Sequence, residues 1–576
     1  MQKTIKRRPL PAHRLVDTGL PALLERLYAA RGIDSPEQLE LTLKRLLKPG
    51  MKGLDEAAEL LADAVVAQAR ILIVGDFDAD GATSSSLAVL ALKAMGAQHV
   101  DFLVPNRFEY GYGLTPEIVL VAAEREPDVI VTVDNGISSV EGVRAAQALG
   151  MAVVVTDHHL AGSVLPKAEA IVNPNQPGCD FPSKNLAGVG VIFYVMNALK
   201  KVLSTMGWFT EVGVEEPNMA QYLDLVALGT VADVVPLDSN NRILVEQGIR
   251  RIRAGVARPG ILALLEVSGR QRERLVASDL GFALGPRLNA AGRLDDMSIG
   301  IRCLLADDYP QARELAAELD GFNRDRRAIE SGMQREAMDM LDKLSVDEAN
   351  PLPWGLCLYD ASWHQGVIGI LASRIKDRFH RPVIVFADAA EGEIKGSARS
   401  IPGLHIRDVL DAVATAHPGL LQKFGGHAMA AGMSLQAQDY AAFCEAFDQE
   451  VKRQLREEDL QVVLLSDGEL RAEEFQLELA RQLREAGPWG QHFPEPLFDG
   501  EFYLVQQRIV GDKHLKLVLA QDPSRRQLID AIAFNVDLAV WPCQTAEKVR
   551  AAFKLDVNEF RGHESLQLMI DYLEPL

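Results

Sequence analysis

Five short apolar runs in the first third of the chain constrain its fold most strongly. They are ILIV, DFLV, VIVTV, AVVVT and AIVN, at residues 71–74, 101–104, 129–133, 152–156 and 170–173. Each of the first four is followed by a polar turn or by a segment with helical periodicity. Short buried strands that alternate with helices are typical of a parallel sheet covered on both faces. We therefore expect an α/β domain built around a parallel sheet.

The chain has 576 residues, which is too long for a single core, and its pattern predicts several domains in succession. A charged segment with helical periodicity follows the first domain, and further strand-like runs then indicate a second α/β domain. Short strands with turn signals near the C-terminus suggest a small barrel. The expected segments are an N-terminal extension (1–50), the first α/β domain (51–305), a long connecting helix (306–348), the second α/β domain (349–455) and the barrel (456–576).

Composition narrows the class of protein. The five cysteines are scattered, odd in number and without CxxC spacing, which argues against a disulfide framework and suits a reducing cytoplasm. No apolar stretch approaches 18 residues and the basic N-terminus lacks an apolar run behind it, so we expect neither a membrane span nor a signal peptide. A net charge of −20 gives no global sign of nucleic-acid binding, yet a basic channel can lie on an acidic protein.

Acidic and imidazole side chains recur where three of the predicted strands end. In an open parallel sheet the carboxyl ends of the strands share one edge, and ligands bind there. One aspartate at a strand end is most often a helix cap, but a whole set on one edge needs a counter-charge such as divalent metal ions. The residues are Asp76, Asp78, Asp80, Asp134, Asp157, His158 and His159, with Asp233 as a further candidate in an apolar stretch.

These residue types also indicate a reaction. Carboxylates alone suit Mg²⁺, and added imidazole moves the preference towards Mn²⁺. Two such ions a few ångströms apart clamp the attacking and departing oxygens of a phosphoryl displacement. A neighbouring histidine can hold a non-bridging oxygen or protonate the leaving alkoxide. The residues therefore predict metal-dependent phosphoester hydrolysis.

Five motifs resemble those of a known superfamily. VGDFDADG (74–81), VTVDNGIS (131–138), VTDHHL (155–160) and GTVADVVPL (229–237) are similar to the four motifs of the DHH phosphoesterases. GGHAMAAGMS (425–434) resembles the motif of the associated DHHA1 domain. From about residue 40 to the end, the order of domains resembles that of the bacterial members that degrade single-stranded DNA from 5′ to 3′. Those members end in an oligonucleotide-binding (OB) barrel.

The resemblance implies roles for the residues at the strand ends. It implies two ions, Mn²⁺ or Mg²⁺, with Asp134 as the bridge between them. His159 would face the scissile phosphate and Asp157 would orient the histidines. Many members have a histidine where this chain has Val74, so Asp76 stays open between a metal ligand and a turn cap. The implied ligands are Asp78, Asp80, Asp134, His158 and Asp233, with Asp76 as the open case.

Other segments predict contacts with DNA. GPRLNAAGRL (285–294) reads as a glycine-rich, turn-forming stretch whose arginines fork onto phosphate. KGSARS (395–400) and GGH (425–427) read as anion-binding turns, the second ahead of an apolar helix. The candidate substrate residues are Arg287, Asn289, Arg293, His364, Ser397, Arg399, Gly425, Gly426 and His427, where His364 is equally compatible with a surface position near a helix start. Barrel candidates are Arg508, Lys513, His514, Lys516, Phe534, Lys554 and Arg561.

The resemblance implies a monomeric, cytoplasmic exonuclease that releases 5′-mononucleotides in DNA repair and recombination. A single-strand-binding protein and a helicase would be further partners. Three alternatives stay open. They are a phosphoesterase for small substrates or short oligonucleotides, a non-catalytic scaffold that binds single strands, and an enzyme that acts mainly on RNA.

Overall fold

The computed structural model describes residues 3–11, 15, 18–106, 110, 112–343, 352–389 and 392–576. The chain divides into two compact units, and each unit combines two separated stretches of sequence. Unit 1 comprises Met1–Arg7 and Arg324–Ser466, and unit 2 comprises Arg8–Asn323 and Asp467–Leu576. The boundary lies inside the 35-residue helix α14 (Tyr309–Lys343), which is the predicted connecting helix; residues 344–348 of that prediction lie outside the described part.

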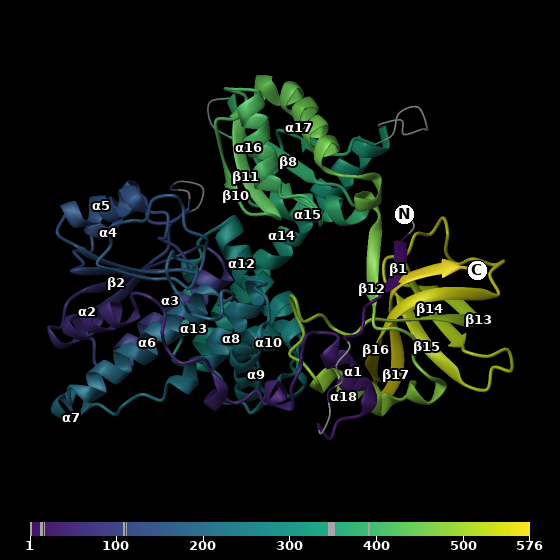
Figure 1. The fold of residues 1–576 in the computed structure, drawn as a ribbon, viewed down its shortest axis with the longest axis horizontal. Coiled ribbons are helices and arrows are strands. Elements are labelled where there is room, and N and C mark those ends of the chain that lie inside the picture. Colours follow the sequence, from purple (N-terminus) through teal and green to yellow (C-terminus); the bar gives the residue numbers. More distant parts are fainter. Residues whose placement is uncertain are drawn as a thin grey trace. The chain divides into compact units, whose positions relative to one another are not determined.

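Unit 2 contains the predicted parallel sheet (Figure 1). All four neighbouring strand pairs in it are parallel, in the order β3-β2-β4-β5-β6. The expected α/β fold is therefore confirmed, with strand ends within one residue of those predicted. The strands are β2 (Ile71–Gly75), β3 (Val100–Leu103), β4 (Val129–Val133), β5 (Ala152–Thr156) and β6 (Ala170–Val172).

Both faces of this sheet are covered, because successive side chains of a strand point to opposite sides. Ile71 and Ile73 belong to the core shared with α2, α3 and α6, whereas Leu72 and Val74 pack with α4 and α5. The helices are α2 (Leu54–Val66), α3 (Ala79–Ala94), α4 (Pro116–Ala123), α5 (Val140–Ala148) and α6 (Gly188–Thr205). Burial on both faces explains why the strands read as continuous apolar runs.

A helical layer continues unit 2 and carries the rest of the site. It includes α8 (Leu223–Ala232), α9 (Ser239–Arg253), α10 (Pro259–Val267), α11 (Ala277–Asp279), the π-helix η5 (Leu280–Leu284), α12 (Gly285–Leu294) and α13 (Ser298–Leu305). Two outlying helices of the same unit are α1 (Ala22–Ala29) and α7 (Trp208–Val212). Among the described residues, a helix both long and apolar enough to cross a bilayer was not found.

A closed barrel completes unit 2, with the strand order β13-β14-β15-β17-β16. Helix α18 (Leu477–Glu485) packs against β16 and β17. The barrel strands are β13 (Phe498–Val510), β14 (His514–Ala520), β15 (Leu528–Ala533), β16 (Lys548–Phe560) and β17 (His563–Pro575).

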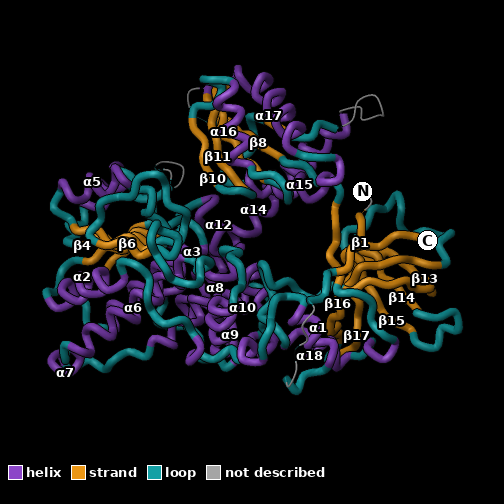
Figure 2. Tube along the Cα trace, in the orientation of Figure 1, coloured by secondary structure: helices purple, strands orange, loops and turns teal. Residues whose placement is uncertain are grey.

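Unit 1 holds a second, mixed sheet in the order β10-β11-β9-β8-β7 (Figure 2). A separate pair joins β1 (Lys3–Arg7) in parallel with β12 (Val462–Ser466). The β-rich segment expected in the barrel thus begins outside it. The other elements are β7 (Leu356–Tyr359), α15 (Ile368–Phe379), β8 (Val383–Asp388), β9 (Glu393–Arg399), α16 (Ile406–Ala416), β10 (Lys423–Gly426), β11 (Ala430–Gln436) and α17 (Tyr440–Gln454).

Candidate metal centre

The turn between β2 and α3 gathers three carboxylates. Asp78 caps α3, because its Oδ1 accepts hydrogen bonds from the backbone N–H groups of Asp80 (2.9 Å) and Gly81 (3.0 Å). A Cβ atom on Gly81 would lie 2.4 Å from the carbonyl oxygen of Asp76, so only glycine permits this close turn. Asp76 and Asp80 are buried, and the tight turn holds all three acidic residues at the edge of the sheet.

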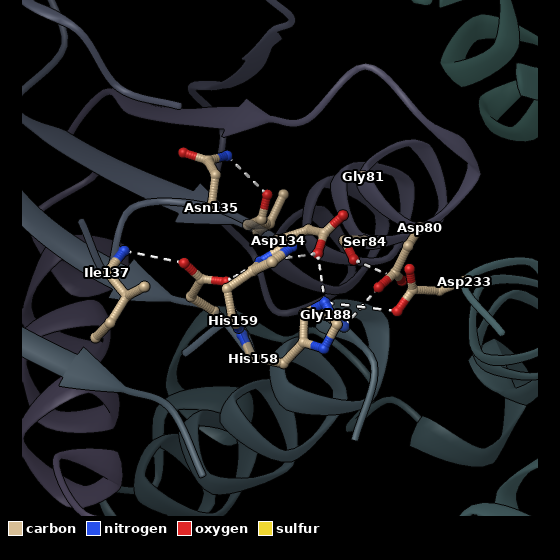
Figure 3. Close-up of polar contacts among 12 residues, drawn as sticks. Asp80, Gly81, Ser84, Asp134, Asn135, Ile137, His158, His159, Gly188 and Asp233 are labelled. Carbon is tan, nitrogen blue, oxygen red and sulfur yellow. Dashed lines mark hydrogen bonds and ion pairs between the residues drawn. The ribbon is translucent and has the colours of Figure 1, made fainter. Parts of the chain in front are cut away.

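Asp80 is fixed by the first turn of α6 (Figure 3). Its two carboxylate oxygens accept hydrogen bonds from the backbone N–H groups of Gly188 (2.6 Å) and Val189 (2.9 Å). A Cβ atom on Gly188 would lie 2.6 Å from the Cβ atom of Asp134, so glycine lets the helix start approach both carboxylates. Free N–H groups at a helix N-terminus favour negative charge, and the N-terminus of α6 holds the Asp80 carboxylate in place.

Asp134 lies at the centre of the cluster, directly after β4. Its backbone is in the left-handed region (φ 61°), which re-aims the side chain away from the strand direction. Its Oδ1 lies 3.0 Å from Nε2 of His158, and the same nitrogen lies 3.5 Å from Oδ2 of Asp233, at the end of α8 (Figure 3). His158 therefore links carboxylates from two different elements.

Asp157 lies behind the histidines and orients them. Its Oδ1 accepts hydrogen bonds from the backbone N–H of His158 (2.7 Å) and from Nδ1 of His159 (2.7 Å), while Oδ2 accepts one from the N–H of Ile137 (2.9 Å). Both carboxylate oxygens are thus used inside the protein. The His159 side chain is partly exposed and points its other ring nitrogen away from Asp157.

Three overlapping groups in this cluster have the geometry of metal-binding sites. In each group one ligand atom per residue lies within 4.8 Å of the others. Asp134 and His158 each belong to two of the three groups, so the arrangement fits two ions side by side. Asp76 belongs to one group, which gives it the geometry of a ligand, although that role stays a prediction. The groups are Asp76 with Asp78 and Asp134, Asp80 with His158 and Asp233, and Asp134 with His158 and His159.

Burial and crowding perturb the cluster electrostatically. Burial, followed by repulsion from Asp78, raises the pKa of Asp80 to about 7 despite its two N–H donors. Burial and neighbouring carboxylates raise the pKa values of Asp134 and Asp233 well above the usual range. Burial lowers the pKa of His159, but the hydrogen bond to Asp157 and the charges of the neighbouring carboxylates together outweigh this effect, and the net result is a pKa of about 9. A bound cation would therefore stabilise the ionised form of these crowded carboxylates.

The pKa shifts predict how a divalent cation stabilises the fold. Asp80, Asp134 and Asp233 have folded-state pKa values above their usual 3.8, so the folded protein holds protons that the unfolded chain has released. Their contribution to stability is complete below about pH 4 and is lost as the pH rises towards 7 and above. A cation replaces those protons. We expect Mn²⁺ to raise the Tm of EDTA-treated protein more at pH 8 than at pH 5.5, as measured by scanning fluorimetry; an equal rise would contradict this linkage.

The GPRLNAAGRL segment is not a turn, and this prediction was wrong. Residues 285–294 form α12, whose Leu288, Ala290 and Ala291 are buried. Gly292 serves close packing, since a Cβ atom there would lie 2.0 Å from the carbonyl oxygen of Phe77. The glycine and proline suggested a loop, but the apolar face of the segment is buried as a helix.

The candidate substrate residues of α12 separate in the structure. Arg287 is buried and its Nη2 lies 2.8 Å from the Asp320 carboxylate, so it points into the protein. Asn289 accepts a hydrogen bond from the N–H of Ala79 (2.7 Å), which braces the acidic turn rather than reaching outwards. Arg293 lies partly exposed in the last turn of the helix. Substrate contacts by these residues stay predictions, and the geometry favours Arg293.

The candidates on the mixed sheet of unit 1 lie on strands β9 and β10, which are joined through β11. Ser397 and Arg399 lie within strand β9, and the GGH segment belongs to the β10–β11 hairpin, so neither of the two predicted turns is correct as described. Ser397 pairs with Gly432, which pairs in turn with Gly425. Gly426 has φ 146°, and the N–H of His427 donates to the carbonyl of Ala430 (2.8 Å).

The start of α15 lies against the same two β9 residues. A Cβ atom on Gly369 would lie 2.9 Å from both Ser397 Oγ and Arg399 Nη2, and His364 precedes this helix start. Arg399 donates to the Ser397 hydroxyl and the Ala398 carbonyl, neither of which carries a charge, and burial lowers the pKa of its guanidinium. A phosphate would supply the missing negative charge.

The barrel candidates also separate. Lys516 is paired with Asp530 and Lys554 with Glu495, so both have acidic partners in the barrel unit. Arg508, Lys513 and Arg561 are exposed. His514 and Phe534 form an edge-to-face pair with ring centroids 5.0 Å apart, and Phe534 is half exposed. Lys513 precedes His514 directly, and this exposed cation next to an aromatic pair suits a single strand better than the paired lysines do.

Tyr112 is a site residue that the motifs did not reveal. Its hydroxyl lies 3.1 Å from the carbonyl oxygen of Asp134 and 3.1 Å from Nδ1 of His159, and its ring packs edge-on against Phe77. The residue lies in a loop between β3 and α4, outside every motif. Only the juxtaposition of that loop with the strand ends places it in the site.

Comparison with known proteins agrees with the fold and the site. Residues 70–230 match the model of the DHH family N-terminal domain, residues 355–453 the DHHA1 domain and residues 466–572 the RecJ OB domain. The single-stranded-DNA-specific exonuclease RecJ of Escherichia coli is 56% identical over all of both chains, and that of Dickeya dadantii is 58% identical over 99% of each. The crystal structure of RecJ with Mn²⁺ from Thermus thermophilus has a TM-score of 0.78 at 31% identity, covering 97% of this chain and 76% of the other.

Proposed function

This chain belongs to the RecJ family of single-stranded-DNA-specific exonucleases, and we propose that it removes 5′-mononucleotides from the 5′ end of single-stranded DNA with two divalent metal ions, Mn²⁺ or Mg²⁺. The observation that carries the proposal is the set of overlapping donor groups around Asp134 and His158. The Thermus thermophilus relative was crystallised with Mn²⁺ and also with Mg²⁺, and the donor set found here suits both ions.

The residues divide the work of hydrolysis between them. Asp76, Asp78, Asp80, Asp134, His158 and Asp233 hold the ions. When bound, two ions neutralise phosphate charge and activate a water molecule. Burial raises the pKa of the Asp157 carboxyl, but the hydrogen bond with His159 and the charges of both histidines together lower it below its usual value. Asp157 is therefore ionised and accepts the hydrogen bond from Nδ1 of His159. The other ring nitrogen of His159 lies 3.4 Å from the Tyr112 hydroxyl on a partly exposed ring, and it would donate to a phosphate oxygen or to the leaving alkoxide.

The neighbouring strands β9, β11 and β10 of unit 1 would bind the 5′-terminal phosphate. Ser397, the guanidinium of Arg399 and the glycine-rich hairpin at Gly425 and Gly426 provide donors and close backbone approach. His364 precedes α15, and His427 follows β10. A bound 5′ end would determine which phosphodiester is cleaved.

The proposal extends to the location, oligomeric state and partners of the enzyme. The enzyme would act as a cytoplasmic monomer in repair and recombination, with a single-strand-binding protein and a helicase as partners. The five-segment division would place the catalytic domain at 51–305, the substrate-gripping domain at 349–455 and the barrel at 456–576, although β12 within the last range pairs with β1 instead.

Digestion of end-labelled substrates tests the function. The enzyme is incubated with Mn²⁺ or Mg²⁺ and with single strands, duplexes and RNA of one sequence, labelled at the 5′ or the 3′ end. We expect labelled mononucleotides to appear at once from the 5′-labelled single strand and only late from the 3′-labelled one. Rapid release from the 3′ end would overturn the polarity, and degradation of dinucleotides in preference to long strands would favour the small-substrate alternative.

A further inference from the structure

An open cavity in unit 2 has no part in the mechanism above, and one of its lining residues is Val234, which follows Asp233 in the sequence. Its volume is about 890 Å³. One wall is formed by Val231, Val234 and Phe282, which lie around Asp233 and on the π-helix η5. The opposite wall is formed by the barrel and its approach, including Trp489 and Met569. The cavity therefore extends from residues that flank a proposed metal ligand to the barrel.

Phe282 is the most exposed large apolar side chain recorded in the structure, with 80% of its surface exposed. The backbone around it is nevertheless fixed. Cβ atoms on Gly281 and Gly285 would lie 3.2 Å from Val231 Cγ1 and 3.1 Å from Ala232 Cβ, so η5 packs directly on the turn that ends at Asp233. π-Helices are rare and are found mostly at functional sites. The helix η5 thus presents an aromatic ring to solvent and packs beside the end of α8, where Asp233 lies.

Val234 is a second exposed apolar residue on the same wall. It follows Asp233 directly, has φ 62° and is 63% exposed. A β-branched residue in the left-handed region is strained, and such strain persists mainly at functional sites. Two apolar side chains are thus held in water, at a cost, next to a metal ligand.

The cavity wall carries seven carboxylates and five cations, so it does not attract phosphate groups. Arg270 is paired with Asp279, Arg484 with Asp556, and Lys554 with Glu495. Cations that already have carboxylate partners are poor binders of further phosphates. The surfaces left to a ligand on the η5 wall are apolar, and a nucleobase offers the matching flat face.

We propose that Phe282 stacks on a base of the single-stranded substrate as the strand passes from the metal cluster into this cavity, with Val234 supporting the same base. The inference rests on the proposed function for the identity of the strand. Phe282 is a positioning residue in this account, because it holds the nucleotides next to the scissile phosphate in register without touching the reacting atoms.

Equilibrium binding in EDTA tests the stack without hydrolysis. Fluorescence anisotropy of a labelled 20-mer is measured for the wild type and for Phe282→Ala, Phe282→Leu and Phe282→Trp. We expect the Ala and Leu variants to weaken binding between roughly fivefold and a hundredfold, and the Trp variant to bind as the wild type does, because base–aromatic stacking depends on a ring. Leu120→Ala, a change at a residue on α4 that is 64% exposed, is the matched control and should have no effect.

A scan with abasic nucleotides distinguishes base stacking by Phe282 from a purely structural role of this residue. Removing one base at a single position of the 20-mer should weaken binding to the wild type by the same factor and should leave binding to Phe282→Ala unchanged. Additive losses at every position, or Phe282→Ala binding within about twofold of the wild type, would overturn the inference. Failure of the proposed function gives a different result, namely a wild type that binds strands but does not degrade them with metal.

Discussion

Asp134→Asn is expected to abolish nuclease activity while the protein stays folded and binds single strands. Asp134 belongs to two of the three metal-binding groups and lies 3.0 Å from His158, so its carboxylate joins the two halves of the site. Outer-shell partners of a metal typically contribute about 10- to 100-fold, and the loss of this central ligand should exceed the upper end of that range. Asparagine suits the substitution better than alanine, because it tolerates the left-handed backbone at this position (φ 61°).

Initial rates on 5′-labelled single strands with saturating Mn²⁺ measure the loss. Asp63→Asn, at an exposed position on α2, removes a carboxylate far from the cluster and should keep full activity. Anisotropy with the same strand should give dissociation constants for both variants close to that of the wild type. Substantial activity in a carefully purified Asp134→Asn protein would exclude the proposed centre.

The strand ends and their carboxylates could be predicted because their determinants are local. A strand buried on both faces must be a continuous apolar run, and parallel pairing brings the polar residues after each run to one edge. Asp134 and His158 therefore meet as expected. Asp233 reaches them from the end of helix α8, which the strand pattern does not predict. The division of labour within the acidic turn is less local. Asp78 uses one oxygen to cap α3, and the sequence pattern does not distinguish a cap from a ligand.

Contacts between distant segments decided the features that the sequence pattern did not show. Arg287 pairs with Asp320, 33 residues away, and no local pattern shows that this arginine turns inwards. Strand β12 was expected in the barrel, but it pairs with β1 from the other end of the sequence. The two predicted anion-binding turns of unit 1 are strand residues, because glycine marks close backbone approach in a sheet as well as in a turn.

Arg31→Ala is expected to lower the free energy of unfolding by about 3–5 kcal/mol, the usual cost of breaking a buried ion pair on one side. Arg31 forms a bidentate pair with Asp467 (3.0 and 2.9 Å), and both side chains are almost fully buried. Its Nε also donates to the carbonyl of Pro494 (2.6 Å). The Arg31 side chain therefore holds both Asp467 and Pro494, which precede the first barrel strand, against α1. Urea unfolding measures the change. Arg70→Ala, which breaks an exposed pair with Glu126, should cost no more than about 1 kcal/mol.

A double variant separates the worth of this pair from the cost of an orphaned charge. In Arg31→Ala the buried Asp467 loses its bidentate partner and keeps only the more distant guanidinium of Arg8, at 3.4 Å. Adding Asp467→Asn removes the uncompensated charge, while the side-chain oxygen can still accept the hydrogen bond from the N–H of Leu497. The double variant should therefore be more stable than Arg31→Ala alone. Additive losses would instead mean that each residue contributes through packing, and Arg31→Met would then recover most of the stability.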